Sequence, residues 1–198
     1  MSSQPVNEPI LGYAPGSSER IALQEELDRQ MEEVVEIPCI INGEKVYTGN
    51  TSTQVIPHKH GHIIANVHQA GKTEIEAACQ AAINAQEEWI NMGLEARCAI
   101  FERCAELLAG PWRMKVNAST MLNQSKTAFQ AEIDSACELI DFFNFNCEYL
   151  YNIHKQQPKY SPEGMKNTTE YRALEGFVFA VTPFNFTSIA ANLPCAPA

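Results

Sequence analysis

The sequence lacks the features of a secreted, disulfide-stapled or membrane-spanning protein. Its seven cysteines are odd in number and form no Cys-x-x-Cys pair, and no apolar run approaches the roughly 20 residues that a membrane span requires. Residues 1–20 contain a single basic residue, Arg20, which suits neither a signal peptide nor an Arg-rich transit peptide. We therefore expect reduced thiols in a reducing compartment and no association with a membrane.

Positive charge is also scarce. There are 14 Lys and Arg residues against 24 Asp and Glu residues, so the formal net charge is −10. An acidic surface repels phosphate backbones and anionic headgroups, so nucleic acid is not an expected partner. Hydrophobic residues make up 45% of the chain and charged residues 19%, which predicts a packed core. A length of 198 residues allows one domain or parts of two.

Three alternating histidines, His58, His60 and His62, are the only candidate metal ligands at close spacing. On a strand they would share one side, where imidazoles can bind zinc. However, Pro57 and Gly61 indicate a turn, and no carboxylate or thiolate is spaced to complete the site. We expect no metal.

The first third of the sequence predicts an arm, a helix and short strands. Residues 1–16 contain three prolines and two glycines and predict an extended arm. A helix capped by Ser17 or Ser18 is expected to continue to about Ile37. Turn and strand signals then predict two strand pairs, a hairpin with an Asn-Gly type I′ turn in 39–47 and a pair formed by 54–56 and 63–67.

Helical periodicity dominates the middle of the chain. Four helices are expected, at 73–89, 94–108, 113–124 and 127–152. Residues 158–174 are polar and contain Pro162 and Gly164. This composition predicts either an extended two-stranded arm or a solvated loop.

A short apolar run near the end of the chain carries the main functional signal. Residues 177–181 predict a buried strand, and Thr187 or Ser188 is placed to cap a short helix that reaches Leu193. Asn185 would then lie at the carboxyl end of a strand, where open α/β sheets bind ligands. Its carboxamide is an uncharged donor suited to an oxyanion, and the alternative is a turn Asn that bonds its own backbone.

Cys195 is the thiol nearest to Asn185 in the sequence. No base lies close in sequence to lower its pKa, so we do not expect it to be a nucleophile.

The string Thr182-Pro183-Phe184-Asn185-Phe186-Thr187, which follows Glu175-Gly176-Phe177-Val178, resembles the aldehyde dehydrogenase superfamily. Further strings resemble its Δ1-pyrroline-5-carboxylate (L-glutamate γ-semialdehyde) dehydrogenase family and occur in that family's order. They are Asn7-Glu8-Pro9-Ile10, Ile37-Pro38-Cys39, His60-Gly61-His62, Gln130-Ala131-Glu132-Ile133-Asp134, Glu138-Leu139-Ile140-Asp141-Phe142-Phe143, Gln156-Gln157-Pro158 and Tyr171-Arg172-x-Leu174. The resemblance runs from about residue 7 to the end, and the chain stops before the family's midpoint. Two departures are Ser125, where the family pattern has Gly, and Pro194, where a helix should continue.

The resemblance implies an α/β fold of aldehyde dehydrogenase type, limited to its N-terminal part. After the arm at 1–16, residues 17–157 would supply the helices and hairpin of the cofactor domain. Residues 158–174 would belong to an oligomerisation flap, and 175–198 would begin the dinucleotide-binding sheet, which is truncated.

The resemblance also implies a function, the NAD-dependent oxidation of glutamate γ-semialdehyde to glutamate in proline catabolism, by a homo-oligomer in the mitochondrial matrix. Because no presequence is visible, the cytoplasm is the alternative location. Asn185 would stabilise the oxyanion, and Phe186 would pack on the aliphatic part of the substrate, unless it is an ordinary core Phe. Glu138 would pair with the α-ammonium of the substrate, unless it is a solvated helix residue.

The family's nucleophilic Cys, general-base Glu and ribose-contacting Lys lie downstream of this chain's last residue. We therefore expect the chain alone to be inactive. Two rivals stay open: a non-catalytic product that assembles with full-length subunits through 158–174, and a dehydrogenase for another semialdehyde.

Overall fold

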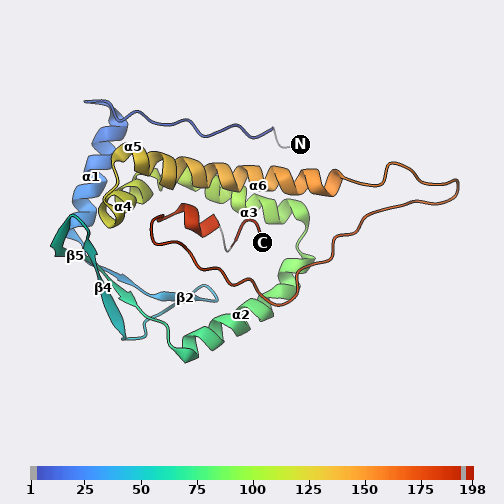
Figure 1. The fold of residues 1–198 in the computed structure, drawn as a ribbon, viewed down its shortest axis with the longest axis horizontal. Helices are drawn as coiled ribbons and strands as arrows, with labels where there is room; N and C mark the ends of the chain where they lie inside the picture. The colour runs from blue at the N-terminus through green and yellow to red at the C-terminus, as the bar shows by residue number, and fades with distance from the viewer. Residues whose placement is uncertain (1–3, 193–194) are drawn as a thin grey trace.

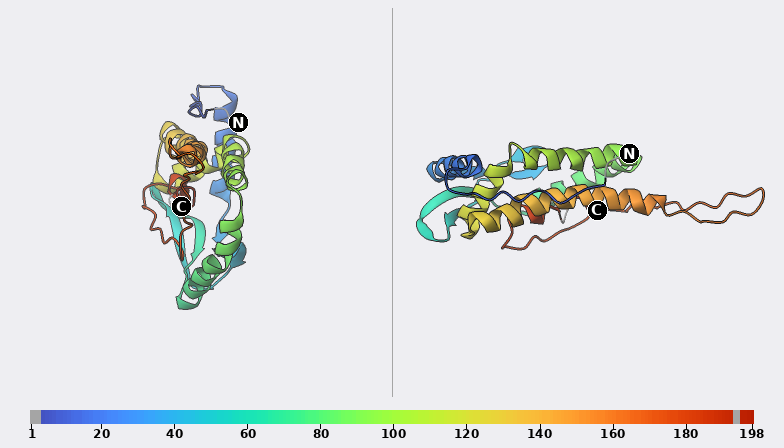
Figure 2. Two further views of the ribbon diagram at one scale, coloured as in Figure 1. Left: turned by 90° about the vertical axis from the view of Figure 1, so that its right-hand side faces the viewer. Right: turned by 90° about the horizontal axis from the view of Figure 1, so that it is seen from above.

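The computed structural model of the protein describes residues 4–192 and 195–198. Two long helical segments, α3 and α5–α6, lie side by side along one edge, with α1 and α4 at one end (Figure 1). Strands β4 and β5 and helix α2 form the opposite edge, and the last residues of the chain run between the two edges (Figures 1 and 2). Residues between α6 and this last segment project away from the body.

The helices and strands follow one another as listed here: α1 (Ser18–Glu32), β1 (Val35–Ile37), β2 (Cys39–Ile41), β3 (Glu44–Val46), β4 (Thr51–Ile56), β5 (Lys59–His68), α2 (Lys72–Asn91), α3 (Leu94–Ala109), α4 (Arg113–Gln124), α5 (Ala128–Ala131), the π-helix η1 (Glu132–Cys137), α6 (Glu138–Lys155) and the 3₁₀-helix η2 (Ile189–Asn192). The predicted helices at 73–89, 94–108 and 113–124 are confirmed, with boundaries shifted by no more than a few residues.

Helix α1 begins where the sequence predicts and ends earlier. The Ser17 side chain accepts a hydrogen bond from the Arg20 backbone N–H and caps the helix. The expected continuation to Ile37 is wrong, because Val35–Ile37 form strand β1, which pairs in parallel with β5. Val35 and Ile37 are β-branched, and pairing with a strand about 30 residues downstream outweighs their weak helical preference.

The two predicted strand pairs are confirmed. Strands β2 and β3 form an antiparallel hairpin, and Asn42 and Gly43 at its turn both have positive φ angles, 52° and 79°, as a type I′ turn requires. Strands β4 and β5 pair antiparallel, and with β1 they form a three-stranded sheet in the order β1-β5-β4.

The helix predicted at 127–152 is interrupted by a π-helix. Residues Glu132–Cys137 follow i→i+5 spacing between α5 and α6, a geometry that sequence periodicity does not signal. Helix α6 packs on α3 through an apolar cluster that includes Ala105, Leu139, Ile140 and Phe143. The extra residue per turn in η1 rotates the side chains that follow it relative to those before it.

Glu132 in this π-helix has no exposed surface, and it gathers a buried polar network that the sequence did not reveal. Its carboxylate pairs with Arg113 of α4 and accepts from the Tyr13 hydroxyl at 2.6 Å and from the Asn117 amide at 2.8 Å. Burial alone would raise the pKa of Glu132, but the Arg113 guanidinium and the hydrogen bonds keep this pKa below its ordinary value.

The same network holds the N-terminal arm in place. The Leu11 backbone N–H donates to Glu132 at 2.8 Å, Arg113 donates to the Pro9 carbonyl at 2.7 Å, and Arg113 also pairs with Glu8. The predicted arm is therefore extended but fixed on the helices by buried charge.

The last segment differs from its prediction. The strand expected at 177–181 is wrong for this chain, because the described residues there form no strand and Phe179 is 81% exposed. A parallel strand is stable only between neighbouring strands and covering helices, and the described part of this chain supplies neither beside it. The short helix predicted after Thr187 is present as η2, while Leu193 and Pro194 lie outside the described residues.

Residues 158–174 extend from the end of α6 as a polar projection (Figures 1 and 2). The Thr169 backbone N–H donates to the Gln157 side chain at 2.8 Å, and no strand ladder forms within this projection. Its assignment to an oligomerisation flap, like the division of the chain at 16, 157 and 174, stays a prediction.

The buried pair makes a first prediction about stability. Arg113→Met leaves the Glu132 carboxylate buried without its cation, so we expect a loss of about 3–5 kcal/mol in the free energy of unfolding. The matched control is Arg103→Met, which removes the exposed Arg103–Glu106 pair of α3 and should cost less than about 1 kcal/mol. Urea unfolding followed by circular dichroism measures both, and equal losses would contradict the prediction.

Candidate active-site loop

Residues 182–188, called here the Asn185 loop, lie on the end of α4 and on the π-helix. The Gln124 carboxamide faces three backbone groups of this loop. When its nitrogen is directed at the Asn185 carbonyl oxygen, 3.0 Å away, its oxygen accepts from the Phe186 and Thr187 N–H groups at 3.0 and 3.1 Å. One side chain therefore satisfies three polar backbone groups in two consecutive peptide units of the loop.

Two hydroxyl contacts continue this attachment. The Ser188 hydroxyl lies 2.6 Å from the Ser135 carbonyl oxygen, to which it donates, and 2.9 Å from the Ser135 hydroxyl in η1. The Thr187 and Thr120 hydroxyls are hydrogen-bonded to each other. These hydroxyls bond to neighbouring helices, and the capping of the short helix by Thr187 or Ser188 stays a prediction.

Lys126 is the cation at this site. Helix α4 ends at Ser125, whose φ of 53° is left-handed, and the chain turns so that Lys126 reaches the loop. Gly adopts such a positive φ more readily than Ser does, which agrees with the Gly that the resemblance led us to expect at position 125. The Lys126 ammonium donates to Asp134 of η1 at 2.6 Å and to the Asn185 carbonyl oxygen at 2.9 Å, and it lies 4.3 Å from the centroid of the Phe186 ring.

Asn185 is held by its backbone. Its carbonyl oxygen accepts from Lys126 and Gln124, whereas its exposed carboxamide makes no hydrogen bond to any described residue. The alternative of a turn Asn bonded to its own backbone is therefore not what the structure shows. The oxyanion role of Asn185 stays a prediction.

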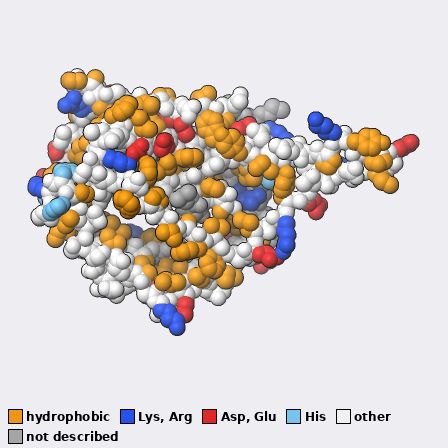
Figure 3. All heavy atoms as spheres, viewed as in Figure 1, with side chains coloured by type: hydrophobic (Ala, Val, Ile, Leu, Met, Phe, Trp, Pro, Cys, Tyr) orange, Lys and Arg blue, Asp and Glu red, His pale blue; other side chains and the backbone are white. Residues whose placement is uncertain are grey.

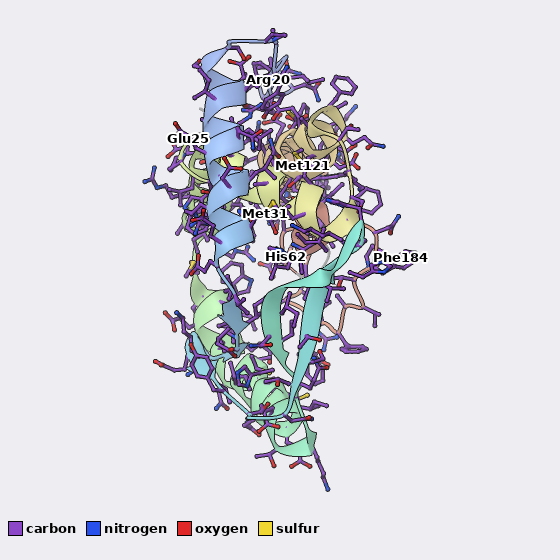
Figure 4. The ribbon with its side chains drawn as sticks, turned by 90° about the vertical axis from the view of Figure 1, so that its left-hand side faces the viewer. Arg20, Glu25, Met31, His62, Met121 and Phe184 are labelled. Atoms are coloured by element: carbon purple, nitrogen blue, oxygen red, sulfur yellow. The ribbon has the colours of Figure 1, made fainter. Side chains whose placement is uncertain are left out.

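Two phenylalanines flank Asn185 and lie in different surroundings. Phe184 is 96% exposed and projects outward (Figure 4). Phe186 is half-buried, and its face is covered by the Lys126 ammonium. Hydrophobic side chains are spread over the face of the molecule along which this last segment runs (Figure 3). Phe186 is therefore neither a fully buried core residue nor freely solvated, and its contact with substrate stays a prediction.

Glu138 begins α6 and is half-buried. Burial raises the pKa of its carboxyl, and Asp134 and Asp141 raise it further, while Lys126 opposes them. The predicted residues Asn185 and Glu138 are not in direct contact, but Lys126 influences both. Sequence reasoning missed Lys126 and Gln124 as site residues, although the polar string that contains them separates two helices.

The other candidates do not form a site. His58 contacts the Ser125 hydroxyl at 2.7 Å, and His62 contacts the Met31 carbonyl of α1 at 2.7 Å, where Figure 4 labels both His62 and Met31. In the described part of the chain, no three His, Cys, Asp or Glu side chains converge on a possible metal position.

The cysteines behave mainly as small apolar residues. Cys98, Cys137 and Cys147 are buried, and burial raises the pKa of Cys137 and of Cys147 to about 12. Burial also raises the pKa of Cys195, which disfavours the thiolate that a nucleophile needs. Among residues 4–192 and 195–198, no helix is long and apolar enough to cross a membrane.

The class of protein follows from a match between residues 46–198 and the aldehyde dehydrogenase family. The chain belongs to this family. Its α/β fold is of aldehyde dehydrogenase type, limited to the N-terminal portion, which confirms the fold class and the resemblance drawn from the sequence.

The relatives within the family are Δ1-pyrroline-5-carboxylate dehydrogenases. The chain is 47% identical to the Agaricus bisporus protein of that name, over 97% of this chain and 35% of that protein. It is 45% identical to the mitochondrial Homo sapiens protein, over 97% of this chain and 34% of that protein. The crystal structure of the Mycobacterium tuberculosis enzyme bound with NAD superposes with a TM-score of 0.94 at 45% identity, over 98% of this chain and 36% of that chain. The chain thus spans about a third of the length of these relatives.

The raised pKa of Glu138 predicts a pH-dependent effect on stability. A carboxyl whose folded pKa is raised contributes stability that is fully present below its unfolded pKa and is lost as the pH rises through the folded pKa. We therefore expect Glu138→Gln to unfold at a higher urea concentration than the wild type at pH 7, with the difference shrinking as the pH falls to about 4.

The control for this comparison is Glu163→Gln, on the exposed projection, which should leave the urea midpoint unchanged at both pH values. A Glu138→Gln variant that is less stable than the wild type at pH 7, or a difference independent of pH, would show that ionisation of Glu138 does not oppose folding.

Proposed function

We propose that this chain is the N-terminal part of an NAD-dependent L-glutamate γ-semialdehyde (Δ1-pyrroline-5-carboxylate) dehydrogenase, which oxidises the semialdehyde to glutamate in proline catabolism. The observation that carries the proposal is the 41–47% identity to dehydrogenases of that name over almost the whole of this chain. Related structures with bound NAD support the choice of cofactor.

NAD supplies the hydride acceptor in this reaction. The described residues include no closely spaced glycine turn of the kind that approaches a pyrophosphate. No step is therefore assigned to the cofactor, and the contribution of this chain lies on the aldehyde side of the reaction.

Asn185 would act when a thiolate from elsewhere in the enzyme adds to the aldehyde carbon and the carbonyl oxygen becomes an anion. Its carboxamide N–H₂ donates without changing charge, and its backbone is already fixed by two side chains. A donor fixed before the charge develops stabilises the oxyanion without reorganising at the moment of reaction.

Glu138 would recognise the amino-acid end of the substrate. Its half-buried carboxylate can pair with an α-ammonium, a group that simple aldehydes lack. Phe186 would contact the aliphatic carbons between the two ends. Discrimination by a charged pair is larger than discrimination by apolar contact alone.

A second candidate function is assembly without catalysis. The projection at 158–174 extends from the body and exposes Tyr160 and Met165, at 75% and 68%. These side chains suit contact with another subunit, and in a whole enzyme the same projection would serve a homo-oligomer. Several relatives are named as mitochondrial, so we propose the mitochondrial matrix as the location, with the cytoplasm as the alternative.

The oxyanion role predicts a loss of turnover number. In a chimaera that joins this chain to the remaining two thirds of the Agaricus bisporus relative, Asn185→Ala should lower kcat about 10²–10³-fold, because a donor to the oxyanion is lost. NADH absorbance measures the rate. The control is Asn152→Ala, an exposed Asn on α6 that bonds only Glu148 and should leave kcat unchanged.

Two further arms complete this experiment. The 198-residue chain alone should form no NADH from the semialdehyde, and turnover above background would show that it contains all essential groups. Co-purification of that inactive chain with the full-length relative would support the assembly function, and kcat unchanged by Asn185→Ala would contradict the oxyanion role.

Glu138 makes a separate prediction about specificity. In the same chimaera, Glu138→Gln should raise KM for the α-amino semialdehyde by about 10-fold or more, because a charge-assisted hydrogen bond becomes a neutral one. KM for a semialdehyde acid of equal length without the amino group should change little. Equal effects on both substrates would favour a dehydrogenase for another semialdehyde.

A further inference from the structure

Lys126 connects the two residues to which the proposed function assigns chemistry. Its side chain is only 17% exposed, and a lysine so covered requires partners for its ammonium. Two of its three donors are used, on Asp134 and on the Asn185 carbonyl oxygen. The Phe186 ring covers another side of the ammonium.

We propose that Lys126 is a positioning residue, which holds the Asn185 loop on the π-helix through the Asn185 carbonyl oxygen and supplies the positive charge beside Glu138. The kinetic half of this proposal rests on the proposed function. The structural half concerns only contacts within this chain.

The first step is the direction of the Asn185 side chain. Lys126 and Gln124 both donate to the Asn185 carbonyl oxygen, and Gln124 also accepts from the following N–H. Donors on the carbonyl oxygen and an acceptor on the N–H fix the plane of the peptide that links Asn185 to Phe186, and that plane limits the direction in which the Asn185 carboxamide extends. Small displacements of a catalytic group lower rates strongly, because reacting groups must meet in a narrow geometry.

The second step is the rigidity of the anchor. Lys126 bonds to Asp134, which lies two residues after the fully buried Glu132 in the same π-helix. Glu132 is fixed by Arg113 and Tyr13. The loop is therefore attached to a helical turn that a fully buried and hydrogen-bonded carboxylate holds in place.

The third step is charge. The charged groups that act on Glu138 are Asp134 from η1, Asp141 from α6 and Lys126 from the α4–α5 connection. Lys126 is tied to this cluster by its ion pair with Asp134 at 2.6 Å. Without Lys126, three carboxylates would remain together, and Glu138 would hold its proton to a higher pH. A protonated Glu138 cannot pair with an ammonium as an anion, so substrate capture would weaken at the acidic side of the pH profile.

The structural half is tested on the 198-residue chain by hydrogen–deuterium exchange. Lys126→Met should speed exchange at the Phe186 and Thr187 amides about 10-fold, since loss of one anchor lets the loop open more often. Lys126→Arg, which keeps the charge and the donors, should retain most of the protection. The matched control is Lys115→Met on α4, whose ammonium lies over the Trp112 ring and has no contact with the loop.

The kinetic half is tested in the chimaera described above. Lys126→Met should lower kcat about 10–100-fold through misplacement of Asn185, and it should move the acidic limb of kcat/KM to higher pH. Lys126→Arg should restore the limb and most of kcat, whereas Lys115→Met should match the parent. If Lys126 had a purely structural role, Lys126→Met would leave the acidic limb of the pH profile of kcat/KM unchanged.

Gln124→Leu separates the anchoring of the loop from the charge beside Glu138. It also tests the anchoring if Lys126→Met does not fold. It removes loop contacts without removing charge, so kcat and amide protection should fall while the acidic limb stays in place. Unchanged protection and an unchanged limb in Lys126→Met would overturn the proposal, as would a shifted limb in Gln124→Leu. A parent chimaera that does not oxidise the semialdehyde would reject the proposed function, while the exchange data would still decide whether Lys126 holds the loop.

Discussion

The structure depends on the burial of one ion pair, Glu132 with Arg113. A carboxylate with no exposed surface must be paired and hydrogen-bonded, and here the partners come from Leu11 and Tyr13 of the arm and from α4. This requirement fixes the rotation of the π-helix. Because Asp134 and Ser135 follow within three residues, the same rotation directs them to the Asn185 loop. The positions of Asp134 and Ser135 beside the Asn185 loop therefore depend on the buried Glu132 carboxylate in the same π-helix.

Local signals made much of the fold predictable. The Ser17 cap and the Asn42-Gly43 turn are each determined by residues within a short stretch of sequence. The family was also readable, because several uncommon strings occur in one order over almost the whole chain, and the match to aldehyde dehydrogenases confirms it. Asn185 was singled out from the end of an expected strand, which the described residues do not form, and from the family strings, and its role stays a prediction.

Features that depend on distant partners were not predictable. Helix α1 ends early because Val35–Ile37 pair with a strand about 30 residues away, and residues 177–181 stay exposed because strand formation depends on neighbours that the described chain does not provide. The π-helix has no periodic signature, so the roles of Glu132, Lys126 and Gln124 could not be read from spacing. These residues look like ordinary polar positions on helices or in a turn until the fold brings them together.

In a protein of net charge −10, the single cation Lys126 acts on two parts of the site, the Asn185 loop and Glu138. Lys126 stands between Asp134, Glu138 and the loop carbonyl, so its charge is balanced locally and its geometry is fixed by bonds to two segments. The buried Arg113–Glu132 pair fixes the π-helix, and Lys126 in the α4–α5 connection then fixes the loop through its pair with Asp134 of that helix. In the proposed enzyme, a change at the Lys126 ammonium would alter both the direction of the Asn185 carboxamide and the ionisation of Glu138. The oxyanion donor and the residue that recognises the substrate ammonium would therefore not vary independently.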